Sequence, residues 1–397
     1  MAERTKINQI FHRVMDRINV IIKTTNDCNL RCKYCYNSES WHKKESLPIE
    51  KFERLIFMLA KDFREICLVW HGGEPTLLGL DYFKKVIDIE NSAHQVNGVV
   101  IRNSLQTNAT LLNEEWIDFF KKYDFRVGVS FDGKDSDKYR QLGEKTLANL
   151  KLMQKKGLKT SCMAVVADDD YDLIENYKFF VENGCAVEFS YVFMEGGAKG
   201  LQGLTKEKFV DKYLKFIDYW FNDKNGLDVR LIETYIAMAM GSYYRICSNS
   251  SCHGKYLSIY PDGTLYNCGR ENMSNYPFGN IDDINAFADI YESDGFKSLV
   301  LGSIERRKKC KETCEFFSEC AGGCADCAVT EGKLDQPAKF SCYCFKHIYT
   351  YIKQKMQEIK DKNLPLSELN PAIARTLKRC FTVSDGNFDN IIAEKFI

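Results

Sequence analysis

Residues 24–37 read TTNDCNLRCKYCYN and place cysteines at positions 28, 32 and 35. Three thiols in so short a stretch are one short of the four ligands that close a structural zinc site. They suit a [4Fe–4S] cluster in which one iron keeps an open coordination position. The stretch follows an apolar run, residues 18–25, with the composition of a β-strand. We therefore expect a loop at a strand end that holds a cluster whose open iron binds a ligand.

Strand-like runs alternate with segments of helical periodicity over the first half of the chain. The expected strands cover residues 18–25, 65–70, 99–106, 126–131, 159–166 and 186–192. The expected helices between them cover residues 49–63, 81–89, 113–123, 145–156 and 173–183. Such alternation predicts parallel strands with crossover helices. The fold class is therefore α/β, a partial (β/α)6 TIM-like barrel whose catalytic loops follow the carboxyl ends of the strands.

From Cys247 onward the composition of the chain changes, and cysteines become frequent. Two more helices are expected before Cys247, at 206–221 and 231–244, and ten of the 17 cysteines lie between 247 and 344. A helix at 348–360 and a polar tail with an isolated Cys380 follow. We divide the chain into an N-terminal segment (1–17), the barrel (18–230), a cysteine-rich domain (231–347) and a C-terminal helix and tail (348–397).

Composition excludes several classes of function. Lys+Arg and Asp+Glu both number 55, and this zero net charge disfavours a general nucleic-acid or membrane-surface binder. The N-terminus has no apolar core typical of a signal peptide, and no apolar run is long enough to span a bilayer. Without an export signal, many cysteines indicate metal ligation rather than disulfides. We expect a protein of the reducing cytoplasm.

The cysteine loop resembles a known family. Cys28-x3-Cys32-x2-Cys35, with Tyr34 before the last cysteine, is similar to the signature of the radical S-adenosylmethionine (radical SAM) enzymes. The resemblance implies that the amino and carboxylate groups of SAM chelate the open iron. It implies reductive cleavage of SAM to a 5′-deoxyadenosyl radical, with Tyr34 lying against the adenine.

Three further stretches resemble motifs of the same family. GGEP, residues 72–75, directly follows the second expected strand and resembles the motif that binds the amino end of SAM. Glycines allow close approach of the backbone, and a carboxylate or carbonyl accepts from an ammonium. LQTNAT (105–110) and GVSFDG (128–133) resemble the ends of strands three and four, although Ser136-Asp137 stands where the family usually has His-Asp. The SAM-contacting residues implied are Tyr34, Gly72, Gly73, Glu74, Asn108, Ser130 and Arg140.

The second cysteine field resembles the SPASM domain, which holds two auxiliary [4Fe–4S] clusters. The match includes Gly263-x4-Cys268 and departs at Cys310-x3-Cys314, where two intervening residues are usual. The resemblance assigns Cys247, Cys252, Cys268 and Cys324 to auxiliary cluster I. It assigns Cys310, Cys314, Cys320 and Cys342 to auxiliary cluster II. Cys342 is preferred to Cys344 because Phe345-Lys346 then matches the Tyr-Lys after the family's last cysteine.

The remaining cysteines have no assigned ligand role. Cys327 and Cys344 are left over in this field, with the possibility open that either replaces Cys342. Cys67, Cys162, Cys185 and Cys380 are isolated and are expected to pack as small apolar residues. The alternative for the whole field is a set of structural zinc sites, which the long gap before Cys268 fits less well.

The resemblance implies a peptide-modifying oxidoreductase with three [4Fe–4S] clusters and SAM. Hydrogen abstraction from a residue of a ribosomally made precursor peptide would be followed by a C–C or thioether crosslink, with electrons leaving through the auxiliary clusters. A flavodoxin- or ferredoxin-type protein would donate electrons. Only 27 residues precede Cys28, which is too few for a leader-recognition domain. We therefore expect either a separate leader-recognition protein as a partner or an enzyme that binds its substrate unaided.

Three alternatives stay open. Anaerobic sulfatase-type formylglycine maturases carry an aspartate base directly after the cysteine that matches Cys268, whereas this chain has Gly269. A radical dehydrogenase of a small molecule is the second alternative. A non-enzymatic iron–sulfur electron carrier is the third, and the open three-cysteine loop disfavours it. As a catalytic base we name Glu188, near the end of the sixth strand; His71 and Arg270 are similarly placed.

Overall fold

A curved parallel sheet forms the centre of the computed structural model, which describes residues 16–381 except 202–203, 243–246 and 248–251. The six parallel strands are β1 (Arg17–Lys23), β2 (Glu65–His71), β3 (Val100–Thr107), β4 (Arg126–Ser130), β5 (Thr160–Val166) and β6 (Ala186–Tyr191). Each pairs with the next along the chain. The expected partial barrel of six βα units is therefore confirmed.

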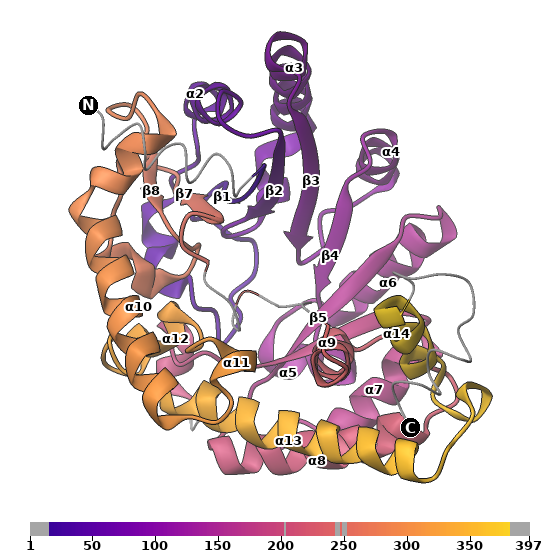
Figure 1. The fold of residues 1–397 in the computed structure, drawn as a ribbon. Coiled ribbons are helices and arrows are strands. Elements are labelled where there is room, and N and C mark those ends of the chain that lie inside the picture. The colour runs from indigo at the N-terminus through magenta and orange to yellow at the C-terminus, as the bar shows by residue number, and fades with distance from the viewer. Residues whose placement is uncertain (1–15, 202–203, 243–246, 248–251, 382–397) are drawn as a thin grey trace.

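Helices cover the outer face of the sheet (Figure 1). They are α2 (Ile49–Leu59), α3 (Gly79–Asn97), α4 (Glu114–Lys122), α6 (Gly143–Lys155) and α7 (Leu173–Glu182), with the short α5 (Ser136–Tyr139) before α6. Local capping explains where several begin: the Asn113 side chain accepts from Trp116 N at 3.1 Å, and Asp172 accepts from Ile174 N at 3.0 Å. The alternate residues Ile18, Val20 and Ile22 of β1 are fully buried beneath these helices.

The sheet continues past β1 in a way that the sequence analysis did not predict. β7 (Tyr256–Ile259) pairs parallel to β1, and β8 (Thr264–Tyr266) and β9 (Gly279–Asn280) follow antiparallel, giving the order β6-β5-β4-β3-β2-β1-β7-β8-β9. These strands come from the cysteine-rich half of the chain. That half is therefore joined to the barrel through backbone hydrogen bonds.

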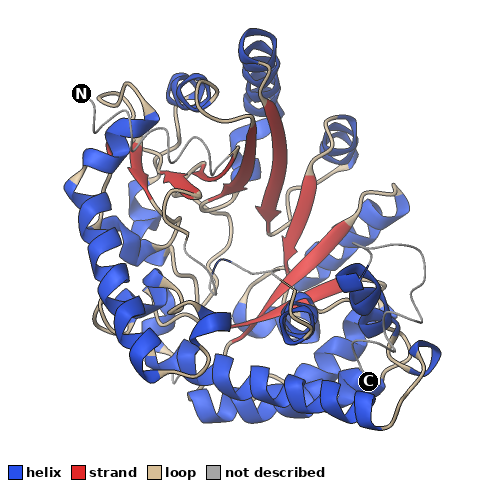
Figure 2. Ribbon diagram, viewed as in Figure 1, coloured by secondary structure: helices blue, strands red, loops and turns tan. Residues whose placement is uncertain are grey.

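The cysteine-rich half wraps around the open side of the barrel (Figures 1 and 2). Its helices are α10 (Asp294–Thr313), α11 (Phe317–Cys320), α12 (Ala325–Thr330) and α13 (Lys339–Asp361). α13 packs against α8 (Lys206–Asn222) and α9 (Arg230–Ala239). No described helix is long and apolar enough to cross a membrane.

The helices of the cysteine-rich half and the C-terminal part differ from the expectations. The 20-residue α10 was not predicted, and α13 begins at Lys339, well before the expected residue 348. Residues 371–381 form α14 (Pro371–Phe381) instead of a polar tail, because Ala372, Ile373 and Leu377 form an apolar face that is buried. The helix expected at 231–244 is α9, which ends earlier, at Ala239. Most of the segment 1–17 and the tail beyond 381 lie outside the described residues.

A buried acid lies between α3 and the sheet. Asn103 Nδ2 donates to Glu90 Oε1 and Oε2 at 3.1 and 2.9 Å, and Trp70 Nε1 donates to Asn103 Oδ1 at 2.7 Å. Burial raises the pKa of Glu90 to about 8, above the ordinary value of about 4.5. The folded state thus favours the protonated acid, and its stability falls as pH rises from about 4.5 through 8.

We predict that Glu90→Gln raises the melting temperature at pH 8.5 and leaves it unchanged at pH 5. The substitution removes the cost of ionising a buried acid, on the order of 1–3 kcal/mol at the higher pH. Anaerobic differential scanning fluorimetry of this variant and of the exposed control Glu115→Gln checks it. An equal shift at both pH values would contradict the assignment of the raised pKa.

Candidate iron–sulfur and SAM site

The cysteine loop, residues 24–37, lies at the carboxyl end of β1 and is attached to the end of β2. Thr24 N donates to His71 O at 2.9 Å, and Gly73 N donates to Thr25 O at 2.7 Å. A Cβ on Gly73 would lie 1.8 Å from Asp27 O. At Gly72, where φ is +114°, it would lie 2.6 Å from Thr25 O. Because they have no side chains, the two glycines allow the loop after β2 to pack closely against the cysteine loop.

The carboxylate of Glu74 points into the protein. Its Oε1 accepts from Thr107 Oγ1 and Thr76 Oγ1, both at 2.7 Å, and its Oε2 accepts from Asn108 N at 2.8 Å. Burial raises the pKa of Glu74, and these hydrogen bonds oppose that rise. The side chain thus joins the ends of β2 and β3. The contacts with SAM expected of this motif stay a prediction.

Asn108 connects the end of β3 to the cysteine loop. Its Nδ2 donates to Asn29 Oδ1 at 2.9 Å and lies 3.9 Å from Cys28 Sγ. Its Oδ1 accepts from Thr110 N at 2.9 Å, which fixes the orientation of the amide. An N–H directed at a thiolate sulfur stabilises its negative charge.

The end of β4 supplies a buried charged cluster. Arg140 Nε pairs with Asp132 Oδ2 at 3.2 Å, and its Nη1 lies 3.8 Å from Cys32 Sγ. The Tyr34 hydroxyl donates to the same Asp132 carboxylate in a short hydrogen bond. Ser130 lies nearby at the strand end, where its Oγ accepts from Gln106 Nε2 at 2.8 Å. Arg140 therefore offers a positive charge to the cysteine loop while Asp132 holds both it and Tyr34.

The segment after β6 covers the far side of the loop. Gly197 N donates to Cys35 O at 3.0 Å. A Cβ on Gly196 would lie 2.5 Å from Cys35 O, and one on Gly197 would lie 2.6 Å from Lys33 O. Segments after β2, β3, β4 and β6 thus all contact the loop that follows β1, at the edge of the sheet where catalytic loops were expected.

The cysteine loop supplies three thiols and no fourth cysteine. Burial raises the pKa of Cys28 to about 12 and of Cys35 to about 11, so bound iron would supply the charge that their thiolates need. Three thiolates with one open position suit a [4Fe–4S] cluster better than a structural zinc site, which takes four ligands.

The eight expected auxiliary ligands separate into two neighbourhoods. Burial and the thiols of Cys324 and Cys247 raise the pKa of Cys252 to about 12. Burial and the thiols of Cys342, Cys310 and Cys314 raise the pKa of Cys320 to about 11. Burial also raises the pKa of Cys268, to which the thiol of Cys324 adds. The assignment of these cysteines to two clusters stays a prediction, with which these neighbourhoods are compatible.

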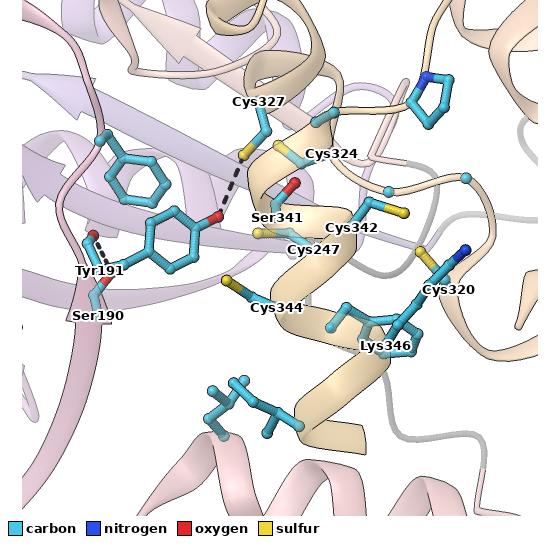
Figure 3. Close-up of a pocket in the computed structure, with 18 of the residues that line it drawn as sticks. Ser190, Tyr191, Cys247, Cys320, Cys324, Cys327, Ser341, Cys342, Cys344 and Lys346 are labelled. Atoms are coloured by element: carbon cyan, nitrogen blue, oxygen red, sulfur yellow. Dashed lines mark hydrogen bonds between the residues drawn. The ribbon is translucent and has the colours of Figure 1, made fainter. Parts of the chain in front are cut away.

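The helix α13 separates Cys342 from Cys344. Two residues along a helix are about 200° apart around its axis. Burial and the Glu331 carboxylate raise the pKa of both thiols, but the second-set thiols of Cys314 and Cys310 contribute only to the rise at Cys342. In Figure 3 the two side chains leave the helix in different directions, with Cys342 on the side of Cys320. Cys327 lies beside Cys324, and the Tyr191 hydroxyl contacts its sulfur at 3.7 Å.

A cavity of about 450 Å³ lies between β6 and the cysteine-rich half. Its lining includes nine of the ten cysteines between 247 and 344, all but Cys252. Glu188 also lines it, but its Oε2 accepts from Leu231 N at 2.9 Å at the start of α9. Burial raises the pKa of Glu188 to about 7. This contact gives Glu188 a helix-capping role, and its role as the base stays a prediction.

Sequence analysis missed an acid pair near Arg270. Arg270 Nη1 pairs with Asp326 Oδ2 at 2.9 Å, and its guanidinium lies 3.3 Å from the centroid of the Phe193 ring. Burial and the nearby carboxylate of Glu195 raise the pKa of Asp326 to about 7, against the opposing effect of Arg270. Both acids are almost fully buried. Asp326 sits between two cysteines, in CADC, which was the one sequence signal available.

His71 lies on the cysteine-loop side of Arg270. Its Nδ1 is 3.3 Å from the Tyr36 hydroxyl. Burial, with the charges of Lys23 and Arg270, lowers the pKa of His71 to about 4, so the ring is neutral. The charge of Arg270 thus acts on His71, and the thiols of Cys324 and Cys268 in turn raise the pKa of Arg270.

Comparisons with known proteins agree with this geometry. Residues 22–180 match the pattern described as the Radical SAM superfamily, and residues 247–327 match an iron–sulfur cluster-binding domain, SPASM. The chain thus carries a Radical SAM domain followed by an iron–sulfur cluster-binding SPASM domain. The radical SAM and SPASM matches together span the β1–α7 part of the barrel and most of the cysteine-rich half.

Similar proteins include sulfatase maturases. The cysteine-type anaerobic sulfatase-maturating enzyme of Clostridium novyi is 26% identical over 341 residues, 78% of this chain and 88% of that protein. The serine-type enzyme of Bacteroides thetaiotaomicron is 26% identical over 381 residues, 85% and 91% of the two chains. This radical SAM chain thus aligns with both types over most of their lengths.

Solved structures share the fold. Native anSMEcpe with bound AdoMet and the Cp18Cys peptide superposes with a TM-score of 0.75 at 24% identity, over 86% of this chain and 98% of that one. Streptococcus suis SuiB bound to the precursor peptide SuiA gives a TM-score of 0.56 at 17% identity, over 86% and 79%. At these identities the likeness supports the radical SAM–SPASM fold alone.

We predict that Gly73→Ala removes the cluster of the 28–35 loop while the other two remain. The added Cβ would collide with Asp27 O, which displaces the cysteine loop. Iron analysis of the anaerobically reconstituted variant should show a loss of about four irons. The control is Gly200→Ala, whose Cβ meets nothing within 4 Å. Full iron content in Gly73→Ala would contradict the close contact between the two loops.

Proposed function

We propose that this radical SAM protein modifies a side chain of a peptide or protein substrate, with SAM and three [4Fe–4S] clusters as cofactors. The observation that carries the proposal is the cysteine loop: its three thiols follow β1 and are held at the strand ends by four neighbouring segments. When bound, SAM and the cluster of this loop supply a 5′-deoxyadenosyl radical, and the auxiliary clusters supply an electron acceptor.

The chain's own residues then have distinct tasks in this proposal. Cys28, Cys32 and Cys35 ligate the first cluster. The backbone of Gly72 and Gly73 accepts from the SAM amino group, since the Glu74 carboxylate is already engaged. Tyr34, Asn108, Ser130 and Arg140 line the SAM site from the ends of neighbouring strands. The ligands of auxiliary clusters I and II are those named in the sequence analysis.

The substrate class rests on the relatives. The named relatives are sulfatase-maturating enzymes, and peptides are bound in the anSMEcpe and SuiB structures. These relatives favour the sulfatase-maturase alternative over the crosslinking that the sequence analysis put first. In formylglycine formation from cysteine, Cβ loses a hydrogen atom and then an electron and a proton, water adds to the carbon, and hydrogen sulfide leaves.

One observation keeps crosslinking as a second candidate. The aspartate base implied for sulfatase maturases is Gly269 here, and a Cβ at that position would lie 2.8 Å from Ile21 Cγ2. Ile21 belongs to β1, so the space for such a side chain is partly filled. A crosslink needs the loss of two hydrogen atoms from the peptide and no added water. A flavodoxin- or ferredoxin-type electron donor and a separate leader-recognition protein are proposed partners.

We predict that anaerobically reconstituted protein, reduced with dithionite, forms 5′-deoxyadenosine from SAM, and that Cys32→Ala does not. A sulfatase-type peptide containing cysteine and the small peptide encoded beside the gene serve as substrates, with mass spectrometry as the readout. Exchange of sulfur for oxygen with loss of hydrogen indicates maturation, and loss of two hydrogens indicates a crosslink. Absence of 5′-deoxyadenosine would overturn the proposed function.

A further inference from the structure

Arg306 on α10 is a buried cation in the cysteine-rich half. The residue is 2% exposed, and all of its hydrogen bonds go to neutral oxygens. Nε donates to Gly322 O at 2.9 Å, Nη1 donates to Leu334 O, and Nη2 lies 3.4 Å from Ser303 Oγ and 3.5 Å from Gly323 O. Within the described part of the chain, none of its contacts is a carboxylate.

A buried charge without a counter-charge is strongly unfavourable. Arg270 in the same domain illustrates the usual arrangement, because Asp326 pairs with it at 2.9 Å. For Arg306, burial lowers the pKa, and the opposing charges are thiols: Cys324 and Cys252 of the first auxiliary set, and Cys310 of the second. Arg306 therefore lacks a carboxylate partner, and the negative charge that compensates it would come from the thiolate-ligated clusters of the two sets.

The guanidinium also holds the backbone that connects the two sets. Gly322 and Gly323 stand between Cys320, a ligand of the second set, and Cys324, a ligand of the first. Their φ angles of +87° and +72° are in the region that favours glycine. Both carbonyls of this turn face Arg306. One side chain therefore touches the single turn that sets the spacing of the two proposed clusters.

We propose that Arg306 is a positioning residue shared by the two auxiliary clusters, and that its charge raises the reduction potential of at least one of them. This inference rests on the proposed assignment of the auxiliary ligands. A nearby buried cation stabilises the reduced, more negative state of a cluster, and charge and hydrogen bonding are established means of tuning such potentials. A raised potential makes the cluster a better acceptor for the electron that leaves an oxidised substrate.

The test measures the potentials directly. In the full chain carrying Cys28→Ala, Cys32→Ala and Cys35→Ala, only the auxiliary clusters contribute to the electron paramagnetic resonance signal, so redox titration reports on them alone. Arg306→Gln removes the charge, and Arg306→Lys keeps the charge but loses the planar fork. Lys308→Gln removes an exposed charge from the same helix and serves as the matched control.

We expect Arg306→Gln to shift at least one auxiliary potential to a more negative value, with Arg306→Lys and Lys308→Gln close to the parent. If Arg306→Gln fails to take up about eight irons whereas Arg306→Lys does, the need for the charge is likewise supported. Equal potentials in the Gln variant and its parent would overturn the proposal. So would equal shifts, or equal losses of iron, in the Gln and Lys variants.

The parent's own iron content tests the ligand assignment separately. If the parent itself lacks about eight irons, the auxiliary ligand sets are wrong, and the proposed role of Arg306 is overturned as well.

Discussion

The contact between Gly73 and the carbonyl of Asp27 is the constraint on which the site depends. At that point two backbones approach more closely than any side chain would permit. The approach fixes the cysteine loop to the end of β2, while Glu74 fixes the same β2 end to β3. The loop is thus held by paired strands rather than by its own short-range contacts. Three thiols that must share one cluster need this rigidity, since metal sites require their ligands in place within narrow tolerances.

The cysteine-rich half depends on a different balance. Burial raises the pKa of most of its thiols, and the same region buries the cation Arg306. Each is unfavourable alone: a buried thiol resists ionisation, and a buried guanidinium lacks a counter-charge. Iron binding resolves both costs together, because ligation requires thiolates and brings negative charge next to the cation. Because β7 pairs with β1, iron binding in the cysteine-rich half also stabilises the barrel.

The sequence revealed the barrel and its cysteine loop because both depend on local patterns. Apolar runs such as residues 65–70 and 126–131 coincide with β2 and β4. It missed α10, whose exposed Leu301 and Ile304 and charged C-terminal half give no clear apolar face. It also missed β7–β9, since strands this short pair only in their tertiary context.

Glu188 was chosen from its strand alone, and its capping contact with Leu231 depends on a helix distant in the sequence. Asp326 and Glu195 could not be paired without the fold.

The central claim is that eleven cysteines hold three separate [4Fe–4S] clusters. Iron, sulfide and zinc analysis of the anaerobically reconstituted chain, together with Mössbauer spectroscopy, tests it most directly. The account predicts about twelve irons per chain, all in cubane clusters, and no zinc. Stoichiometric zinc, or an iron content well below about twelve in fully reconstituted protein, would contradict it.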